Sequence, residues 1–87
     1  MEDKFDSIQE LYENIRRGGE VEFTYDGKKY SITHSEINSE EKIYVMEQNN
    51  YDSLIIFYSA EEIGKYCIGT KRLEDIATKV QVTFRCF

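Results

Sequence analysis

The sequence predicts an α+β domain: an antiparallel or mixed sheet of about five strands with helices packed on one face. Three observations support this class. An amphipathic helix pattern opens the chain, a hairpin pattern follows it directly, and most later strand-like segments come in succession. The predicted order is α-β-β-β-β-α-α-β, in a single α+β domain over residues 1–87. With 40% hydrophobic and 14% aromatic residues, a chain of 87 residues can fill one modest core.

The first predicted helix runs from about Asp6 to Arg17. Ser7 followed by Glu10 forms a capping-box pattern at its start. Gly18-Gly19 end it, because glycine readily leaves the helical conformation. Its apolar stripe at helical spacing consists of Ile8, Leu11, Tyr12 and Ile15.

A β-hairpin follows over Val21–His34. Asp26-Gly27 is a preferred pair for a two-residue type I′ turn, which needs positive φ at both central positions. Pairing across that turn places a largely apolar set of side chains on one face, so we expect a sheet that is buried on one side. The predicted pairs are Tyr25 with Lys28, Phe23 with Tyr30 and Val21 with Ile32.

The middle of the chain predicts two further strands. Ser35–Glu41 is polar and is expected to be a loop. Lys42–Glu47 alternates as a third strand, with Ile43 and Val45 on one face and Tyr44 and Met46 on the other. Ser53–Ser59 is apolar on both faces, a pattern typical of a central or doubly covered strand.

The C-terminal part predicts two short helices and a closing strand. Ser59 and Glu62 form a second capping-box pattern ahead of the first helix, and Lys71–Thr78 predicts the second. The closing strand, Val80–Phe87, alternates strictly. Val80, Val82, Phe84 and Cys86 are expected on one face, and Gln81, Thr83, Arg85 and Phe87 on the other.

Charge and cysteine content narrow the functional classes. A net charge of −6 repels phosphate, so we expect no direct nucleic-acid ligand. The acidity serves solubility or suits a basic protein partner, and both interpretations stay open. Two cysteines favour a reducing cytosol. No signal peptide is recognisable, and the longest apolar stretch, Leu54–Tyr58, is too short to cross a bilayer. The expected location is the cytoplasm.

Signatures of catalysis and of cofactors are missing from the sequence. His34 is the only histidine, and it continues the core-facing alternation of the hairpin, which favours packing over a catalytic role. His34, Cys67 and Cys86 lack metal-site spacing. The glycine pair ends a helix and precedes a strand, the reverse of a phosphate-binding loop. We therefore expect no catalytic residue, no cofactor and no metal.

One segment invites a functional interpretation, the acidic and tyrosine-bearing middle of the chain. It could present a negative surface with aromatic anchors to a basic groove. The alternative is a solvated loop pair whose charges protect a strand edge. The candidate partner-binding residues are Glu36, Glu40, Glu41, Tyr44, Glu47, Tyr51 and Asp52.

Two segments resemble small uncharacterised proteins of Gram-positive bacteria and their phages. They are residues 18–33, with Gly-Gly-Glu-Val-Glu-Phe-Thr-Tyr-Asp-Gly, and residues 69–76, with Gly-Thr-Lys-Arg-Leu-Glu-Asp-Ile. The resemblance covers both ends of the chain and leaves Ser35–Tyr51 unmatched. Its motifs form the fold and carry no catalytic residue. More loosely, size and charge are similar to those of phage-encoded anti-defence inhibitors, anti-CRISPR proteins among them. If a phage encodes the chain, the expected cytoplasm is that of the host.

The leading hypothesis is a small acidic, non-enzymatic protein-binding module. It would act as a phage-type inhibitor that blocks a basic nucleic-acid-binding surface on a nuclease, for example a Cas nuclease. One alternative is an immunity or antitoxin protein that caps a toxin. Another is a structural homo-oligomer, such as a homodimer formed through Val80–Phe87. A small enzyme is the last alternative and would need a polar cleft.

Overall fold

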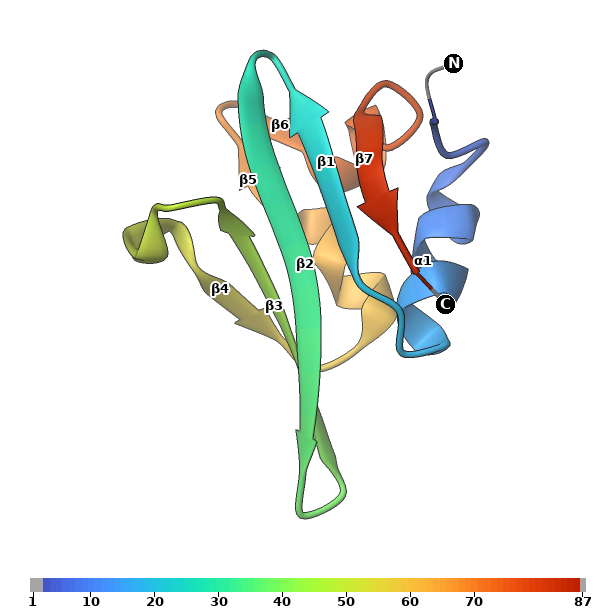
Figure 1. The fold of residues 1–87 in the computed structure, drawn as a ribbon, viewed down its shortest axis with the longest axis vertical. Helices are drawn as coiled ribbons and strands as arrows, with labels where there is room; N and C mark the ends of the chain where they lie inside the picture. Colours follow the sequence, from blue (N-terminus) through green and yellow to red (C-terminus); the bar gives the residue numbers. More distant parts are fainter. Residues whose placement is uncertain (1–2, 87) are drawn as a thin grey trace.

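The computed structural model describes residues 3–86, and of Ile37 it describes the backbone alone. Its main element is a five-stranded sheet in the order β4-β3-β2-β1-β7, in which every neighbouring pair is antiparallel. Helical segments lie behind this sheet in Figure 1, and the face toward the viewer carries no helix. The α+β class, with a sheet covered on one face, is confirmed.

The elements follow the predicted order with three additions, the 3-10 turn η1 and the short strands β5 and β6. A separate two-stranded sheet, β5 with β6, lies between the last two helical segments. Only two segments are α-helices, and the other helical ones are 3-10 turns, labelled η. The elements are α1 (Ile8–Arg16), β1 (Val21–Tyr25), β2 (Lys28–Ile37), β3 (Glu40–Glu47), η1 (Tyr51–Ser53), β4 (Ile55–Phe57), η2 (Ala60–Lys65), β5 (Cys67–Ile68), β6 (Lys71–Arg72), α2 (Leu73–Ile76) and β7 (Gln81–Arg85).

The first hairpin has the predicted register. Phe23 lies opposite Tyr30 and Val21 opposite Ile32, and the rings of Phe23 and Tyr30 stack at 5.3 Å between centroids. Asp26 and Gly27 have φ angles of 52° and 80°, as a type I′ turn requires. Local turn chemistry and the alternation of apolar residues thus determine this part of the fold.

The segment predicted to be a loop at Ser35–Glu41 is instead the end of a second hairpin. β2 continues to Ile37, β3 begins at Glu40, and the turn between them is Asn38-Ser39, with φ angles of 55° and 65°. This hairpin end lies beyond the helical layer (Figure 1). Because both faces of it meet water, its strands need no apolar alternation, and the sequence pattern that marks a strand is missing there.

The fourth strand is an edge strand, and the prediction of a central or doubly covered strand is wrong. β4 pairs with β3 alone, and the Ile55 and Ile56 side chains are 47% and 42% exposed. Its pairing residues are only Ile55–Phe57, shorter than the predicted Ser53–Ser59. The order of strands in a sheet follows from distant contacts, so a purely apolar strand does not by itself indicate a central position.

The strict alternation predicted for the last strand is wrong beyond Val82. Phe23 of β1 pairs with Val82, whereas Glu22 pairs with Phe84, so Thr83 is an extra residue that forms a bulge in β7. The bulge turns Phe84 to the uncovered face, where it is 47% exposed. Phe87, the other aromatic residue of the predicted homo-oligomer interface, lies outside the described residues.

The same bulge turns Arg85 toward the covered face of the sheet. Its guanidinium lies 5.1 Å from the centre of the Phe5 ring, and its two terminal nitrogens donate to Asp3 and Glu10 at 2.9 and 2.8 Å. Asp3 also forms a bridge with Val82, whose amide donates to the Asp3 carbonyl at 2.8 Å. The N-terminal segment therefore packs along the outer edge of β7.

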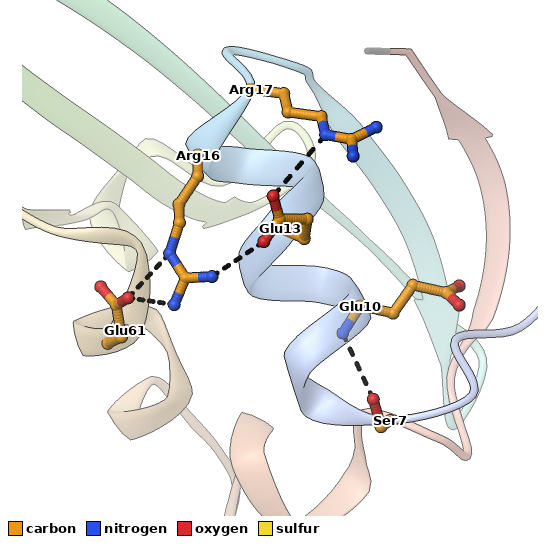
Figure 2. Close-up of polar contacts among 6 residues, drawn as sticks. All are labelled: Ser7, Glu10, Glu13, Arg16, Arg17 and Glu61. Carbon is orange, nitrogen blue, oxygen red and sulfur yellow. Dashed lines mark hydrogen bonds and ion pairs between the residues drawn. The ribbon is translucent and has the colours of Figure 1, made fainter.

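Helix α1 is joined to η2 by an ion pair (Figure 2). Arg16 of α1 donates to Glu61 of η2 through its Nε at 2.8 Å, and to Glu13 at 3.1 Å. The Arg16 hydrogen bond lowers the pKa of Glu61.

At the start of α1 the Glu10 amide donates to the Ser7 hydroxyl at 3.3 Å, which confirms the serine half of the predicted capping box. The Glu10 carboxylate accepts from Arg85, so the reciprocal half of the box is not formed among the described residues.

The second predicted capping box, at Ser59 and Glu62, is not formed. The Ser59 side chain makes no cap hydrogen bond, and the Glu62 amide donates to the Ser59 carbonyl at 3.2 Å. The core between the helical segments and the sheet includes Phe5, Leu11, Ile15, Val21, Phe23, Ile32, Ile43, Val45, Ile63, Leu73, Ile76 and Val80.

The end of α1 meets the end of the chain at a close backbone contact. A Cβ on Gly19 would lie 1.8 Å from the Cys86 carbonyl oxygen, a distance that real Cβ atoms do not reach. The side-chain amide of the buried Asn14 donates to that same oxygen at 3.0 Å. The backbone amide of Cys86 donates to the Glu20 carbonyl at 3.0 Å. Gly19 is thus required because the two chain segments approach closely.

This contact gives a stability prediction for Gly19→Ala. We expect the free energy of unfolding in urea to fall by about 3 kcal/mol, because the methyl group forces two backbone segments apart. Gly69→Ala is the control, since a Cβ there meets nothing within 4 Å. Its cost, about 1 kcal/mol, comes from the left-handed backbone alone. Equal losses in the two variants would contradict the contact.

Candidate functional site

The predicted partner-binding residues lie in three separate places. Glu36, Glu40 and Glu41 lie at the end of the second hairpin. Tyr44 lies midway along β3 on the uncovered face. The third group, at the other end of β3, consists of Glu47, Tyr51 and Asp52. Glu40 and Glu47 lie seven positions apart along the extended strand, roughly 24 Å at about 3.4 Å per residue.

We call residues 35–42, the end of the second hairpin, the acidic arm. Figure 1 shows it projecting past every other element. Glu36 lies directly opposite Glu41, so two carboxylates share one cross-strand position. Lys42 is its one base. Within residues 3–86, the structure shows no salt bridge to Glu36, Glu40 or Glu41.

Tyr44 supports the base of the arm. Its ring is half-buried on the uncovered face, and its hydroxyl is 3.0 Å from the Ser35 hydroxyl on β2. The hydrogen bond crosses between the two strands of the arm where they leave the sheet. Tyr44 therefore has a structural role in holding the arm, alongside the partner-anchoring role that the sequence predicts.

The connection between β3 and β4 presents Tyr51 and Asp52 from a well-bonded turn. The Ser53 hydroxyl accepts from the Glu47 amide at 2.9 Å and donates to the Asn50 carbonyl at 2.6 Å. Tyr51 is 80% exposed in the first position of η1. A large aromatic side chain held in water on an ordered turn is available as an anchor for another molecule.

An exposed apolar surface on β4 was missed by the sequence reasoning. Tyr58, just after the strand, is 57% exposed, and Ile55 and Ile56 are nearly half exposed. Leu54–Ala60 carries no charge. The signal was present in this apolar run, but it predicts exposure only once β4 is known to be an edge.

A groove runs beside β4 on the covered side of the sheet. Its volume is about 420 Å³. Tyr66 forms part of its wall, packing edge-on against Tyr30 at 6.3 Å between ring centroids. The groove combines an apolar strand with one acidic and one basic residue. Its lining residues are Asp52, Ser53, Ile55, Phe57, Lys65, Tyr66 and Cys67.

Charge is segregated along the 38 Å long axis of the molecule. Lys4, Lys71 and Lys79 line a hollow of about 490 Å³ beside the Asp26-Gly27 turn, where Lys71 donates to the Tyr25 hydroxyl at 3.3 Å. That turn is at the top of Figure 1, and the acidic arm is at the bottom. The molecule therefore has a basic end and an acidic end, although its net charge is −6.

Of the residues considered for chemistry, His34 lies against Gly18 and the Cys86 backbone lies against Gly19, whereas Cys67 belongs to β5. His34 is half-buried at Gly18, whose Cβ would lie 3.3 Å from its Nε2, and its Nδ1 is buried without a hydrogen bond among the described residues. Cys67 and Cys86 are exposed free thiols. Over residues 3–86 no three His, Cys, Asp or Glu side chains gather as a metal site would require.

Comparison of the chain with protein-family models, with curated proteins and with solved structures gave no match. The fold and surface of the chain define a small α+β domain with an acidic hairpin arm and an open, apolar sheet edge. Among the described helices, none has the length and apolar character that crossing a membrane requires.

The burial of Tyr66 in the groove wall predicts how the stability of the protein depends on pH. Burial raises the pKa of Tyr66 above 10.0, and it raises that of Tyr30 similarly. The unfolded chain therefore releases these protons first, so this stabilisation is complete below about pH 10 and is lost as the pH rises further. We expect urea unfolding of Tyr66→Phe to depend less on pH than that of the native protein between about pH 8 and about pH 11.

Tyr51→Phe is the matched control for this measurement. Tyr51 is 80% exposed, so its ring is in water in both states and the variant should retain the full alkaline loss of stability. Equal pH dependence in the Tyr66→Phe and native proteins would contradict the burial effect at Tyr66.

Proposed function

We propose that this protein is a small non-enzymatic protein-binding module that occupies a basic, nucleic-acid-binding surface of its partner. The observation that carries the proposal is the acidic arm, a projecting two-stranded hairpin with Glu36 opposite Glu41 and no neutralising salt bridge within residues 3–86. Carboxylates on a projecting ribbon can occupy a groove that normally holds phosphates.

The arrangement of charge in the arm favours a basic partner. Like charges directly opposite across two strands destabilise a hairpin, and at Glu36 and Glu41 the free protein carries that cost. A lysine or arginine placed between the two carboxylates would remove the repulsion and gain a charge-assisted hydrogen bond. Binding energy is thus available at the arm that the isolated protein cannot use.

The separation of basic and acidic residues along the molecule also favours docking through the acidic arm. The lysines around the Asp26-Gly27 turn lie at the end opposite the arm. A basic surface therefore attracts the acidic end and repels the other, which orients the protein as it approaches. The finer form of the proposal makes the partner a nuclease with a basic nucleic-acid channel, such as a Cas nuclease.

The experiment measures displacement of labelled nucleic acid from a panel of such nucleases, at about 50 mM and about 300 mM salt. We expect the native protein to displace nucleic acid from at least one member, and to do so less well at high salt. In the triple variant E36Q/E40Q/E41Q displacement should weaken at least about tenfold. The charge-matched control D6N/E74Q/D75N alters exposed carboxylates away from the arm and should behave as the native protein does.

Absence of displacement by the native protein at low salt would overturn the proposal. So would equal loss of activity in the control and arm variants, because the effect would then follow net charge and not the arm.

A stability measurement accompanies this test. Glu36→Gln with Glu41→Gln should raise the free energy of unfolding by up to about 1 kcal/mol, since the cross-strand repulsion disappears. The same change should weaken nucleic-acid displacement. A variant that is more stable but displaces nucleic acid less well would identify the carboxylate pair as a binding feature. A lower free energy of unfolding would contradict the repulsion between Glu36 and Glu41.

A further inference from the structure

The two edges of the main sheet differ in how they are protected. On β7 the Val82 amide is bonded to the Asp3 carbonyl, and Arg85 pairs with Asp3 and Glu10. β4 has a partner strand on one side only. The segment that contains β4, Leu54–Ala60, has no charged residue and no proline. Proteins commonly protect an exposed edge with charges, proline or covering segments, and on β4 only its short length provides protection.

The groove lies along this unprotected edge. Ile55 and Phe57 of β4 line one wall, and Tyr66, next to η2, lines the other. Peptides that bind by strand addition gain main-chain hydrogen bonds from a free edge and specificity from pockets for alternate side chains. β4 and its groove supply both requirements in one place.

Carboxylates flank the apolar edge at both of its ends. Asp52 lies close before Ile55, in η1. At the other end Ile43 is the last residue of β3 that pairs with β4, at Phe57, and β3 continues unpaired on that side to Glu41 and Glu40. Each flank also holds one lysine, Lys65 at the Asp52 end and Lys42 between Ile43 and Glu41. Carboxylates still outnumber bases at both ends, because Glu47 adds to Asp52 at the first end and Glu40 adds to Glu41 at the second.

These flanks also distinguish between two occupants, a second copy of this chain and a basic partner. In an antiparallel pair of β4 strands, the Asp52 end of one copy would face the Glu40 and Glu41 end of the other. Each copy carries a net charge of −6, so acidic groups would meet at both ends of the pair. A partner segment with basic ends would meet carboxylates at both ends instead.

We infer that β4 binds an extended segment of a partner protein as a sixth strand, with alternate apolar side chains in the groove and a lysine or arginine at each end. The inference rests on the proposed function for the basic character of the partner and adds the mode of binding. The acidic arm then contacts the folded basic surface, and β4 holds one extended segment next to it.

The test uses a synthetic peptide and the full chain. The peptide has alternating valine and threonine in the centre and two lysines at each end, and a second peptide replaces every lysine with glutamate. Amide hydrogen exchange and chemical shifts are followed by NMR during titration. We expect the lysine peptide to slow exchange at the outward-pointing amides of residues 55–57 and to shift the resonances of Tyr66, and the glutamate peptide to do neither.

Two variants compare the edges of the sheet. Ile56→Lys places a charge on β4, where the side chain is 42% exposed, and should weaken binding of the lysine peptide at least about tenfold. Phe84→Lys is the matched control on β7, with a side chain that is 47% exposed, and should leave binding unchanged. The NMR spectrum of each variant also reports whether the sheet is intact.

A third variant tests the flanking charge. Asp52→Asn keeps the size of the side chain and should weaken binding of the lysine peptide about threefold, as loss of one exposed charge pair implies. Glu20→Gln, at an exposed position away from β4, is its control.

The possible results separate this inference from the proposed function. Exchange protection at β4 that Ile56→Lys removes and Phe84→Lys retains supports strand addition. A lysine peptide that leaves the β4 amides unprotected overturns it, and displacement of nucleic acid by the arm is unaffected by that result. Protection that appears without peptide and increases with protein concentration, together with a dimer in sedimentation, also overturns it, in favour of a second copy.

Discussion

The register of β2 is the constraint on which the rest of the structure depends. This ten-residue strand pairs with β1 on one side and β3 on the other. Two turns with positive φ, Asp26-Gly27 and Asn38-Ser39, set that register at its two ends. A shift of one residue would turn Tyr30 and Ile32 to the uncovered face, so the core and both hairpins depend on the same alignment.

The length of β2 also separates the charges of the molecule. Its start lies among lysines at the first turn, and its end carries Glu36 beyond the helical layer. A shorter strand would bring Glu36 and Glu41 over the core, where an unpaired carboxylate is costly. Projection into water is what allows the acidic arm to exist without neutralising partners within residues 3–86.

The two sheet edges show how the same fold treats distant segments differently. On β7 a bulge at Thr83 turns Arg85 inward to Asp3 and Glu10, so the N-terminal segment covers that edge. On β4 the chain returns directly into η2 and leaves Ile55 and Ile56 half exposed. A protein that covers part of one sheet edge and leaves the other open favours association at the open edge, because the backbone groups there are accessible to another strand.

Sequence by itself determined the local elements: the α+β class, the Ser7 cap of α1 and the pairing of Phe23 with Tyr30 across Asp26-Gly27. These depend on residues a few positions apart, whose turn chemistry and periodicity are legible in one chain. Of the candidate site, sequence identified the acidic residues but not that Glu36 and Glu41 face each other, because polar strands surrounded by water show no alternation. Only tertiary structure decided that β4 is an edge and that Phe84 turns outward. Both depend on contacts between segments far apart in the chain, and local patterns carry no information on the order of strands or on a one-residue bulge.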